Sequence, residues 1–139
     1  MNFSFNPSEG LVAVQVRLWG PRARAVVRLA LDTGASETLV NWEIAVLLGY
    51  DPSVSATRRQ TTTGSGVEFA PEISVDRIEA HGIERFGFPA LCHTLPPSAG
   101  VDGLLGLDFL RGQRLALDFR TGIIVVNWQF SQQTPCAWG

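Results

Sequence analysis

Apolar and polar residues alternate imperfectly in two consecutive segments near the start of the chain, residues 11–19 and 23–31. Both segments are rich in β-branched residues, and this pattern is typical of strands with one buried face. Gly20 and Pro21 lie between them and provide turn chemistry. We therefore expect a hairpin whose second strand ends at Asp32.

The pattern changes after Asn41, where residues 42–48 form an apolar run of about two helical turns that Gly49 ends. Asn is a preferred residue at the start of a helix, and Gly at its end. A second, brief helix is expected at 108–111. Both predicted helices are short.

The rest of the chain reads as strands and turns. Residues 58–69 hold two β-prone arms around a tip of Gly64, Ser65 and Gly66, the composition of a mobile hairpin. Pro and Gly make 95–100 a loop. Further turns are expected at 80–82 and 120–122. Four more strands are predicted at 72–78, 86–92, 114–119 and 122–128. The expected fold is mainly β.

Length and charge limit the possible classes of protein. With 139 residues we expect a single domain, 1–139, with its core at about 11–128 and a flexible polar tail at 131–139. The net charge is −2, from 13 acidic and 11 basic residues. All the basic residues are arginines and form no large cluster, so we expect no nucleic acid partner.

The same sequence predicts a soluble, cytoplasmic protein with no membrane partner. The first residues lack the basic and long apolar segments of a signal peptide, and no stretch approaches the roughly 20 apolar residues that span a bilayer. Cys92 and Cys136 have no paired metal-ligand or redox spacing, so we expect reduced thiols.

The candidate for chemistry is the segment from Asp32 to Ser36, a carboxylate at the end of a buried strand followed by a small, flexible turn. A turn aspartate that only caps the backbone is the alternative interpretation. The segment occurs once. Hydrolysis of a peptide by carboxylates alone needs two of them about 3 Å apart, because the pair then shares one proton and supplies both base and acid. If Asp32 acts in such a pair, its single copy predicts that the second carboxylate comes from an identical chain.

The order of these elements resembles the retropepsin-like aspartic protease family, most closely its small bacterial single-domain members. The resemblance rests on Asp32-Thr33-Gly34 after a strand, the glycine-tipped hairpin about thirty residues later, and Leu104-Leu105-Gly106 before a short helix. It covers about residues 11–128. It implies a homodimer of chains with closed, barrel-like β-sheets and one or two short helices.

The resemblance also implies a role for each matching residue. Asp32 corresponds to the catalytic aspartate, and Thr33 to the threonine that joins the two active-site loops across the dimer. Gly34 gives the loop room to pass its partner, and Ala35 and Ser36 complete it. Leu104, Leu105 and Gly106 correspond to the residues that support this loop. The flap that closes over the substrate corresponds to Thr63, Gly64, Ser65 and Gly66.

These roles imply a homodimeric aspartic endopeptidase that cleaves peptide or protein substrates and needs no cofactor or metal. Ala35 has no hydroxyl to donate to an ionised carboxylate, as in retroviral enzymes, so we expect a pH optimum in the mildly acidic to near-neutral range. A peptide-binding or assembly module that keeps the fold without catalysis is the alternative. Against it, a binding module has no chemical need for Asp32.

Other polar residues are expected to be structural. Asp102, beside Gly103, is predicted to be a turn residue that could organise the neighbouring loop, and Asp118 a hairpin-turn residue. His81 is expected in an exposed turn. Neither His81 nor His93 has a partner at metal-ligand spacing.

Overall fold

The computed structural model describes residues 1–63 and 66–129. Gly64 and Ser65 at the predicted flap tip, and the predicted tail at 131–139, lie outside these residues. The described chain is mainly β, with two short α-helices and two 3₁₀ turns. In order, the elements are β1 (Asn2–Ser4), β2 (Ala13–Trp19), β3 (Arg24–Leu31), β4 (Leu39–Asn41), α1 (Trp42–Leu48), η1 (Pro52–Val54), β5 (Arg58–Thr63), β6 (Gly66–Ala80), β7 (Ile83–His93), η2 (Pro97–Ala99), β8 (Gly103–Leu105), α2 (Leu107–Leu110), β9 (Leu115–Asp118) and β10 (Ile123–Val126).

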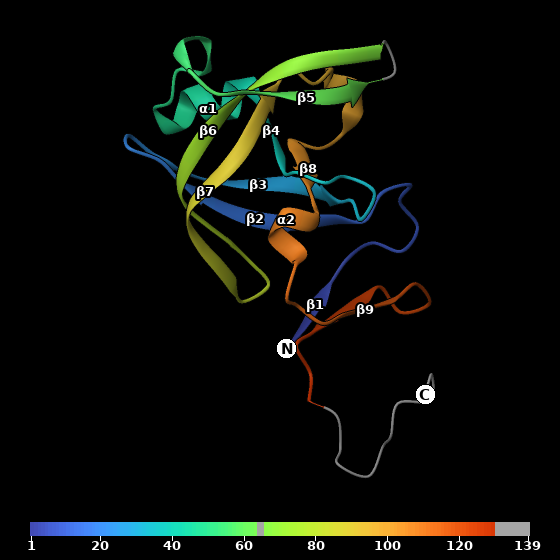
Figure 1. Ribbon diagram of the computed structural model, residues 1–139. Helices are drawn as coiled ribbons and strands as arrows, with labels where there is room; N and C mark the ends of the chain where they lie inside the picture. Colours follow the sequence, from blue (N-terminus) through green and yellow to red (C-terminus); the bar gives the residue numbers. More distant parts are fainter. Residues whose placement is uncertain (64–65, 130–139) are drawn as a thin grey trace.

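Six strands form a closed barrel in the order β2, β3, β8, β4, β7, β6 (Figure 1). The barrel closes because β2 pairs with β3 along its whole length and also with β6 over residues 17–19. The pairs β3–β8 and β4–β7 are parallel, and the other barrel pairs are antiparallel. β5 pairs with β6 alone, so the β5–β6 hairpin extends beyond the barrel.

The barrel encloses the hydrophobic core. Along β2, Val14, Val16 and Leu18 are buried, whereas Gln15 and Arg17 between them are exposed. This two-residue period puts every second side chain inside the barrel. Each aliphatic side chain that is fully buried in this way stabilises the fold by roughly 1.5–3 kcal/mol.

A second, three-stranded sheet joins the two ends of the described chain. β10 lies between β1 and β9, and Asn2 is paired with Val125. In Figure 1 this sheet lies on the side of the barrel away from the β5–β6 hairpin. Gly122 ends the β9–β10 turn with φ +71°, and a Cβ there would lie 2.4 Å from the Phe5 carbonyl oxygen, so this turn requires glycine.

Several predicted elements are confirmed. β2 and β3 form the predicted hairpin, and β9 and β10 are the predicted closing strands. Helix α1 spans 42–48, and Gly49 ends it in the left-handed region with φ +104°. Asn41 occupies the position before the helix, but its side chain makes no capping hydrogen bond, so that part of the interpretation is wrong.

Other parts of the chain differ from the prediction. The second hairpin arm and the separate strand predicted at 72–78 are one continuous strand, β6, of 15 residues. It pairs with β5 up to Pro71 and with β7 from Glu72. The three-residue strands β1, β4 and β8 were not predicted.

The predicted turn at 80–82 is present, but His81 is not exposed in it. Its ring is half-buried, with its centroid 4.2 Å from that of Phe3, and burial lowers its pKa. Cys92 is buried and free, and burial raises the pKa of its thiol to about 12. None of the helices in the described chain is long and apolar enough to cross a membrane.

Candidate active site

Asp32 lies where β3 ends, and strand β8 fixes its position. β8 runs parallel to β3, with Ala30 opposite Leu104 and Leu31 opposite Leu105. The ladder continues one residue further, because the Asp32 N–H donates to the Leu105 carbonyl at 3.0 Å. Leu105 is buried and Leu104 half-buried, so these residues form a packed support beside the carboxylate.

The turn after Asp32 holds the carboxylate from its other side. The Gly34 N–H donates to Asp32 Oδ1 at 2.9 Å, and the Ala35 N–H donates to the Asp32 carbonyl at 3.2 Å. A Cβ on Gly34 would lie 3.2 Å from that same Oδ1, so glycine leaves the carboxylate its space. Asp32 is half-buried, whereas Thr33 is exposed.

The loop then lies against the start of helix α2. The Leu107 N–H donates to the Ala35 carbonyl at 2.8 Å, and the Asp108 N–H donates to the Ser36 carbonyl at 3.2 Å. A Cβ on Gly106 would fall 2.7 Å from the Glu37 carbonyl. Gly106 therefore allows a backbone contact that any other residue would prevent.

Thr38 and Asp108 complete this contact, and the sequence analysis did not identify either as a site residue. The Thr38 hydroxyl donates to Asp108 Oδ1 at 2.7 Å and accepts the Gly106 N–H at 3.1 Å. The Asp108 carboxylate also accepts the Thr38 N–H and the Phe109 N–H. The Asp32 loop is thus hydrogen-bonded to the β8–α2 segment along its length.

A cleft of about 450 Å³ opens at Asp32. Five of the predicted site residues line it, Asp32, Gly34, Ala35, Ser36 and Leu104, together with four residues that the sequence analysis missed, Glu37, Leu39, Gln60 and Leu91. Gln60 belongs to β5, so the base of the β5–β6 hairpin forms part of the cleft. Thr33, Leu105 and Gly106 do not line it.

A second hollow, of about 290 Å³, adjoins this cleft and shares Ser36, Glu37 and Leu91 with it. Here Arg59 of β5 pairs with Glu37 at 3.0 Å and with Glu72 of β6 at 2.7 Å. The hydrogen bond and the charge of Glu72, followed by the charge of Glu37, raise the pKa of Arg59. The hairpin is therefore linked to the Asp32 loop by an ion pair.

The β5–β6 hairpin carries the other predicted site residues. Thr63 and Gly66 are the last paired residues before its tip. Farther from the tip, Glu68 of β6 contacts the ring of His93 at the end of β7, with 2.7 Å between Oε2 and Nε2. In Figure 1 the hairpin and the loop after β3 project toward the same side of the molecule.

The other aspartates that the sequence analysis considered have structural roles. Asp102 accepts the Arg28 N–H at 2.9 Å, and its carbonyl accepts the Asn41 N–H, so it connects β3 to β4. Asp118 accepts the N–H groups of Arg120 and Thr121, and these hydrogen bonds lower its pKa. Neither lines the cleft.

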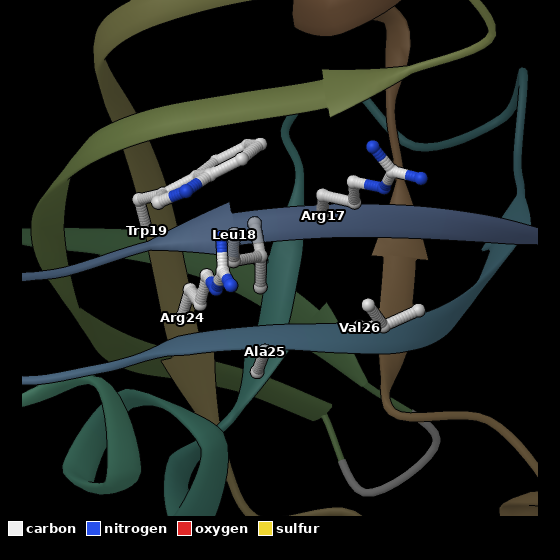
Figure 2. A pocket seen from close by; sticks show the side chains of 6 residues that line it. All are labelled: Arg17, Leu18, Trp19, Arg24, Ala25 and Val26. Atoms are coloured by element: carbon white, nitrogen blue, oxygen red, sulfur yellow. The ribbon is translucent and has the colours of Figure 1, made fainter.

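A separate groove of about 400 Å³ lies on the β2–β3 hairpin and shares no residue with the cleft (Figure 2). Its lining consists of Arg17, Leu18, Trp19, Arg24, Ala25 and Val26. The Arg77 guanidinium lies 4.1 Å from the centroid of the Trp19 ring. Its described lining offers cationic and aromatic contacts and includes no carboxylate.

Among the described residues, the loop carboxylate Asp32 thus lines the cleft. In the part of the chain that the structure describes, Glu37 is the other carboxylate that lines the cleft, and Arg59 already neutralises it. A lone carboxylate can act as a base or an acid at a given moment, whereas peptide hydrolysis needs both at once. Within one chain, the described residues therefore place one unpaired loop carboxylate, Asp32, at the cleft.

Comparisons with known proteins show the family and the fold of the chain. The family model described as aspartyl protease matches residues 14–109, more than half of the chain. No curated protein matches the sequence. Among solved structures, the chain is similar to a retropepsin-like aspartic protease from Rickettsia conorii, with a TM-score of 0.68 and 18% identity over 91% of this chain and 88% of that one. At this identity the likeness concerns the fold.

Proposed function

Since the chain belongs to the aspartyl protease family and is retropepsin-like, we propose that it is a homodimeric aspartic endopeptidase. Asp32 of each chain supplies one carboxylate of a catalytic pair, and the substrate is a peptide or protein in extended conformation. The position of Asp32 supports this proposal most strongly. Its carboxylate accepts the Gly34 N–H and lines the cleft at the end of β3.

The proposed mechanism follows from two carboxylates that share one proton. The ionised member takes a proton from a water molecule, and the protonated member donates to the carbonyl oxygen of the scissile peptide bond. Like charges about 3 Å apart cannot both ionise, which keeps one proton on the pair near neutral pH. The pair titrates as a unit, and both chains contribute equally to it.

The surroundings of Asp32 fit the roles proposed for them. Thr33 is exposed beside Asp32, where its hydroxyl can reach a partner loop, and Gly34 adds no side chain at that point. Leu104, Leu105 and Gly106 hold the loop from behind. A symmetric two-fold contact is the commonest form of soluble oligomer, so this pairing is geometrically ordinary.

We propose that the β5–β6 hairpin, with Thr63 and Gly66 flanking Gly64 and Ser65, is a flap over the bound peptide. An extended peptide between the flap and the cleft would bind as an added strand. Closure would exclude water and position the scissile bond. The contact of Arg59 with Glu37 supports this role, because it places the hairpin base against the catalytic loop.

The test is replacement of Asp32 by Asn, which keeps the size of the side chain and its acceptor oxygen but removes the acid. We expect cleavage of a peptide library, mapped by mass spectrometry, to fall by at least about a thousandfold, while thermal unfolding and dimer content stay as in wild type. Asp51→Asn is the matched control and should cleave normally, since Asn can still cap η1.

The result also decides between the protease and a peptide-binding module with the same fold. Retained cleavage by the Asp32→Asn variant would contradict the catalytic role of Asp32. Peptide binding by wild type without any cleavage, across pH 4 to 8, would instead favour the binding module.

A further inference from the structure

The hollow beside the cleft, here called the Glu37 pocket, is defined by Ser36, Glu37, Arg59, Glu72, Pro89, Leu91 and Asp108. It shares Ser36, Glu37 and Leu91 with the cleft at Asp32. A side chain of a peptide bound at Asp32 can therefore enter it from a position close to the scissile bond. Its chemistry bears on which peptides the cleft accepts.

The Glu37 pocket has more negative than positive charge. Arg59 donates from Nη1 to Glu37 Oε1 and from Nε to Glu72 Oε1, so one guanidinium serves two carboxylates. The second oxygens of Glu37 and Glu72 accept no hydrogen bond within the described residues. Two carboxylates and one guanidinium leave one uncompensated negative charge.

Asp108 adds a further carboxylate to the pocket, but both of its oxygens already accept hydrogen bonds from other residues. Its two oxygens accept hydrogen bonds from Thr38 and from the Phe109 N–H. Asp108 contributes negative charge to the Glu37 pocket without needing a partner there. The free acceptor capacity lies on Glu37 and Glu72.

The rest of the pocket suits the stem of a long side chain. Pro89 and Leu91 give it apolar walls, and Leu91 is buried. Lys and Arg side chains combine a methylene stem that packs on apolar surface with a charged end that donates hydrogen bonds. An apolar wall leading to unsatisfied carboxylate oxygens matches that combination.

We infer that the Glu37 pocket determines specificity by taking a Lys or Arg side chain of the substrate, whose cationic end donates to Glu37 and Glu72. The inference rests on the proposed protease function and names the substrate class of that site. An acidic side chain would have to bind Arg59, which two carboxylates already neutralise, and would meet the net negative charge. The charge balance therefore favours a cation.

The test compares sets of peptides that differ at one position, with Lys, its uncharged analogue norleucine, or Glu, placed in turn at each position around the cleaved bond. At one of these positions we expect kcat/KM to be about tenfold higher for Lys than for norleucine, since hydrogen bonds to charged groups are stronger than those between neutral groups. The difference should lie mainly in KM and should shrink at high salt.

Two variants should change the ratio of kcat/KM for Lys and norleucine peptides in opposite directions. Glu37→Gln removes a negative charge and should bring the Lys to norleucine ratio close to one. Arg59→Gln removes the competing cation and should raise the ratio above that of wild type. Glu43→Gln is the matched control, because Glu43 is exposed on α1 and does not line the pocket. It should leave both activity and the ratio unchanged.

A binding measurement separates failure of this inference from failure of the proposed function. Pools of blocked hexapeptides with Lys or norleucine fixed at one position are titrated into Asp32→Asn, and binding is followed by fluorescence anisotropy. Tighter binding of a Lys pool supports the inference even if wild type cleaves nothing. Equal binding of the pools, or a preference for Glu that Arg59→Gln removes, overturns it whether or not peptides are cleaved.

Discussion

At the scale of single residues, the Thr38 hydroxyl is a buried polar group whose hydrogen bonds connect the segments behind the candidate site. Thr38 is 1% exposed, and it is the one buried polar residue among residues 1–60 and 67–129, whose side chains the structure describes. Its oxygen links the Gly106 backbone to the Asp108 carboxylate, and both lie behind the Asp32 loop. This buried hydroxyl both donates and accepts a hydrogen bond. Its removal is costly, because the buried groups that it contacts are then left without a hydrogen-bond partner.

Thr38→Val tests this position. Valine has nearly the same shape but leaves the buried Gly106 N–H without an acceptor, so the free energy of unfolding should fall by about 2–4 kcal/mol. Urea denaturation measures the change. Thr57→Val is the control, because Thr57 is exposed and should lose less than about 0.5 kcal/mol. A loss equal to that of the control would show that the hydroxyl is not structurally important.

The same residues show what a sequence can reveal about a site. Asp32, Thr33 and Gly34 are contiguous, so their order alone indicates a carboxylate in a tight turn. Thr38 is separated by 70 residues from Asp108, and Glu37 by 22 from Arg59. No local pattern marks either pair. For Asp108 taken alone, its position two residues after Gly106, at the start of a short helix, was a signal, but nothing in the sequence connects it with Thr38.

At the scale of elements, His93 connects the β5–β6 hairpin to the barrel. Nε2 faces the Glu68 carboxylate at 2.7 Å, and Nδ1 faces the Thr94 carbonyl at 2.9 Å. Both partners are acceptors, so only the doubly protonated ring can donate to both. The Glu68 hydrogen bond, followed by the Thr94 carbonyl, raises the pKa of His93.

This pair predicts a pH-dependent stabilisation of the hairpin. Because the folded-state pKa of His93 is raised, the stabilisation is fully present below its unfolded value of about 6.5 and is lost as pH rises through the folded value. Glu68→Gln should therefore lower the unfolding temperature at pH 6 but not at pH 8.5. Both side chains are substantially exposed, so the effect should stay below about 1 kcal/mol.

Thermal unfolding at low salt, with amide hydrogen exchange in β5 and β6, measures the change. Glu84→Gln is the control, because Glu84 pairs with Arg77, whose charge does not change in this range. Its effect should be the same at both pH values. If the effect of Glu68→Gln is also independent of pH, His93 is not the titrating partner.

The sequence predicted those elements whose own residues show a clear pattern. It did not predict the strands that form only because a neighbouring strand pairs with them. The alternation in β2 and β3 and the glycine after α1 are local features. β1, β4 and β8 have three residues each, too few for any period, and they exist because β10, β7 and β3 pair with them. The prediction placed a hairpin arm ending at 69 and a separate strand at 72–78, but β6 is continuous and changes partners at Pro71.

At the scale of the whole molecule, the proposed dimer makes activity a property of two chains. A mixed dimer, in which one chain keeps Asp32 and the other carries the Asp32→Asn substitution, would lack an acid–base pair. Mixing wild type with an equal amount of Asp32→Asn under exchanging conditions should therefore reduce the activity of a fixed total concentration to about one quarter, since random pairing gives that share of intact dimers.

Peptide cleavage before and after overnight mixing measures this effect. An equal mixture of wild type and Asp51→Asn at the same total concentration is the control and should keep the full activity of wild type. If activity in the first mixture stays at one half, the site is complete within one chain or the chains do not exchange. Sedimentation of the mixture separates these cases, because a monomer that cleaves at full rate contradicts the dimer.

The continuity of β6 determines how the hairpin can move. Its 15 residues form the second arm of the hairpin at one end and pair with β2 to close the barrel at the other. Through β6, the hairpin is therefore attached to the barrel without a loop that could act as a hinge. Opening it requires the strand to bend near Pro71, where the pairing partner changes and a backbone N–H is missing. The hinge of the proposed flap then lies within a strand, and its stiffness depends on how firmly the barrel holds that strand.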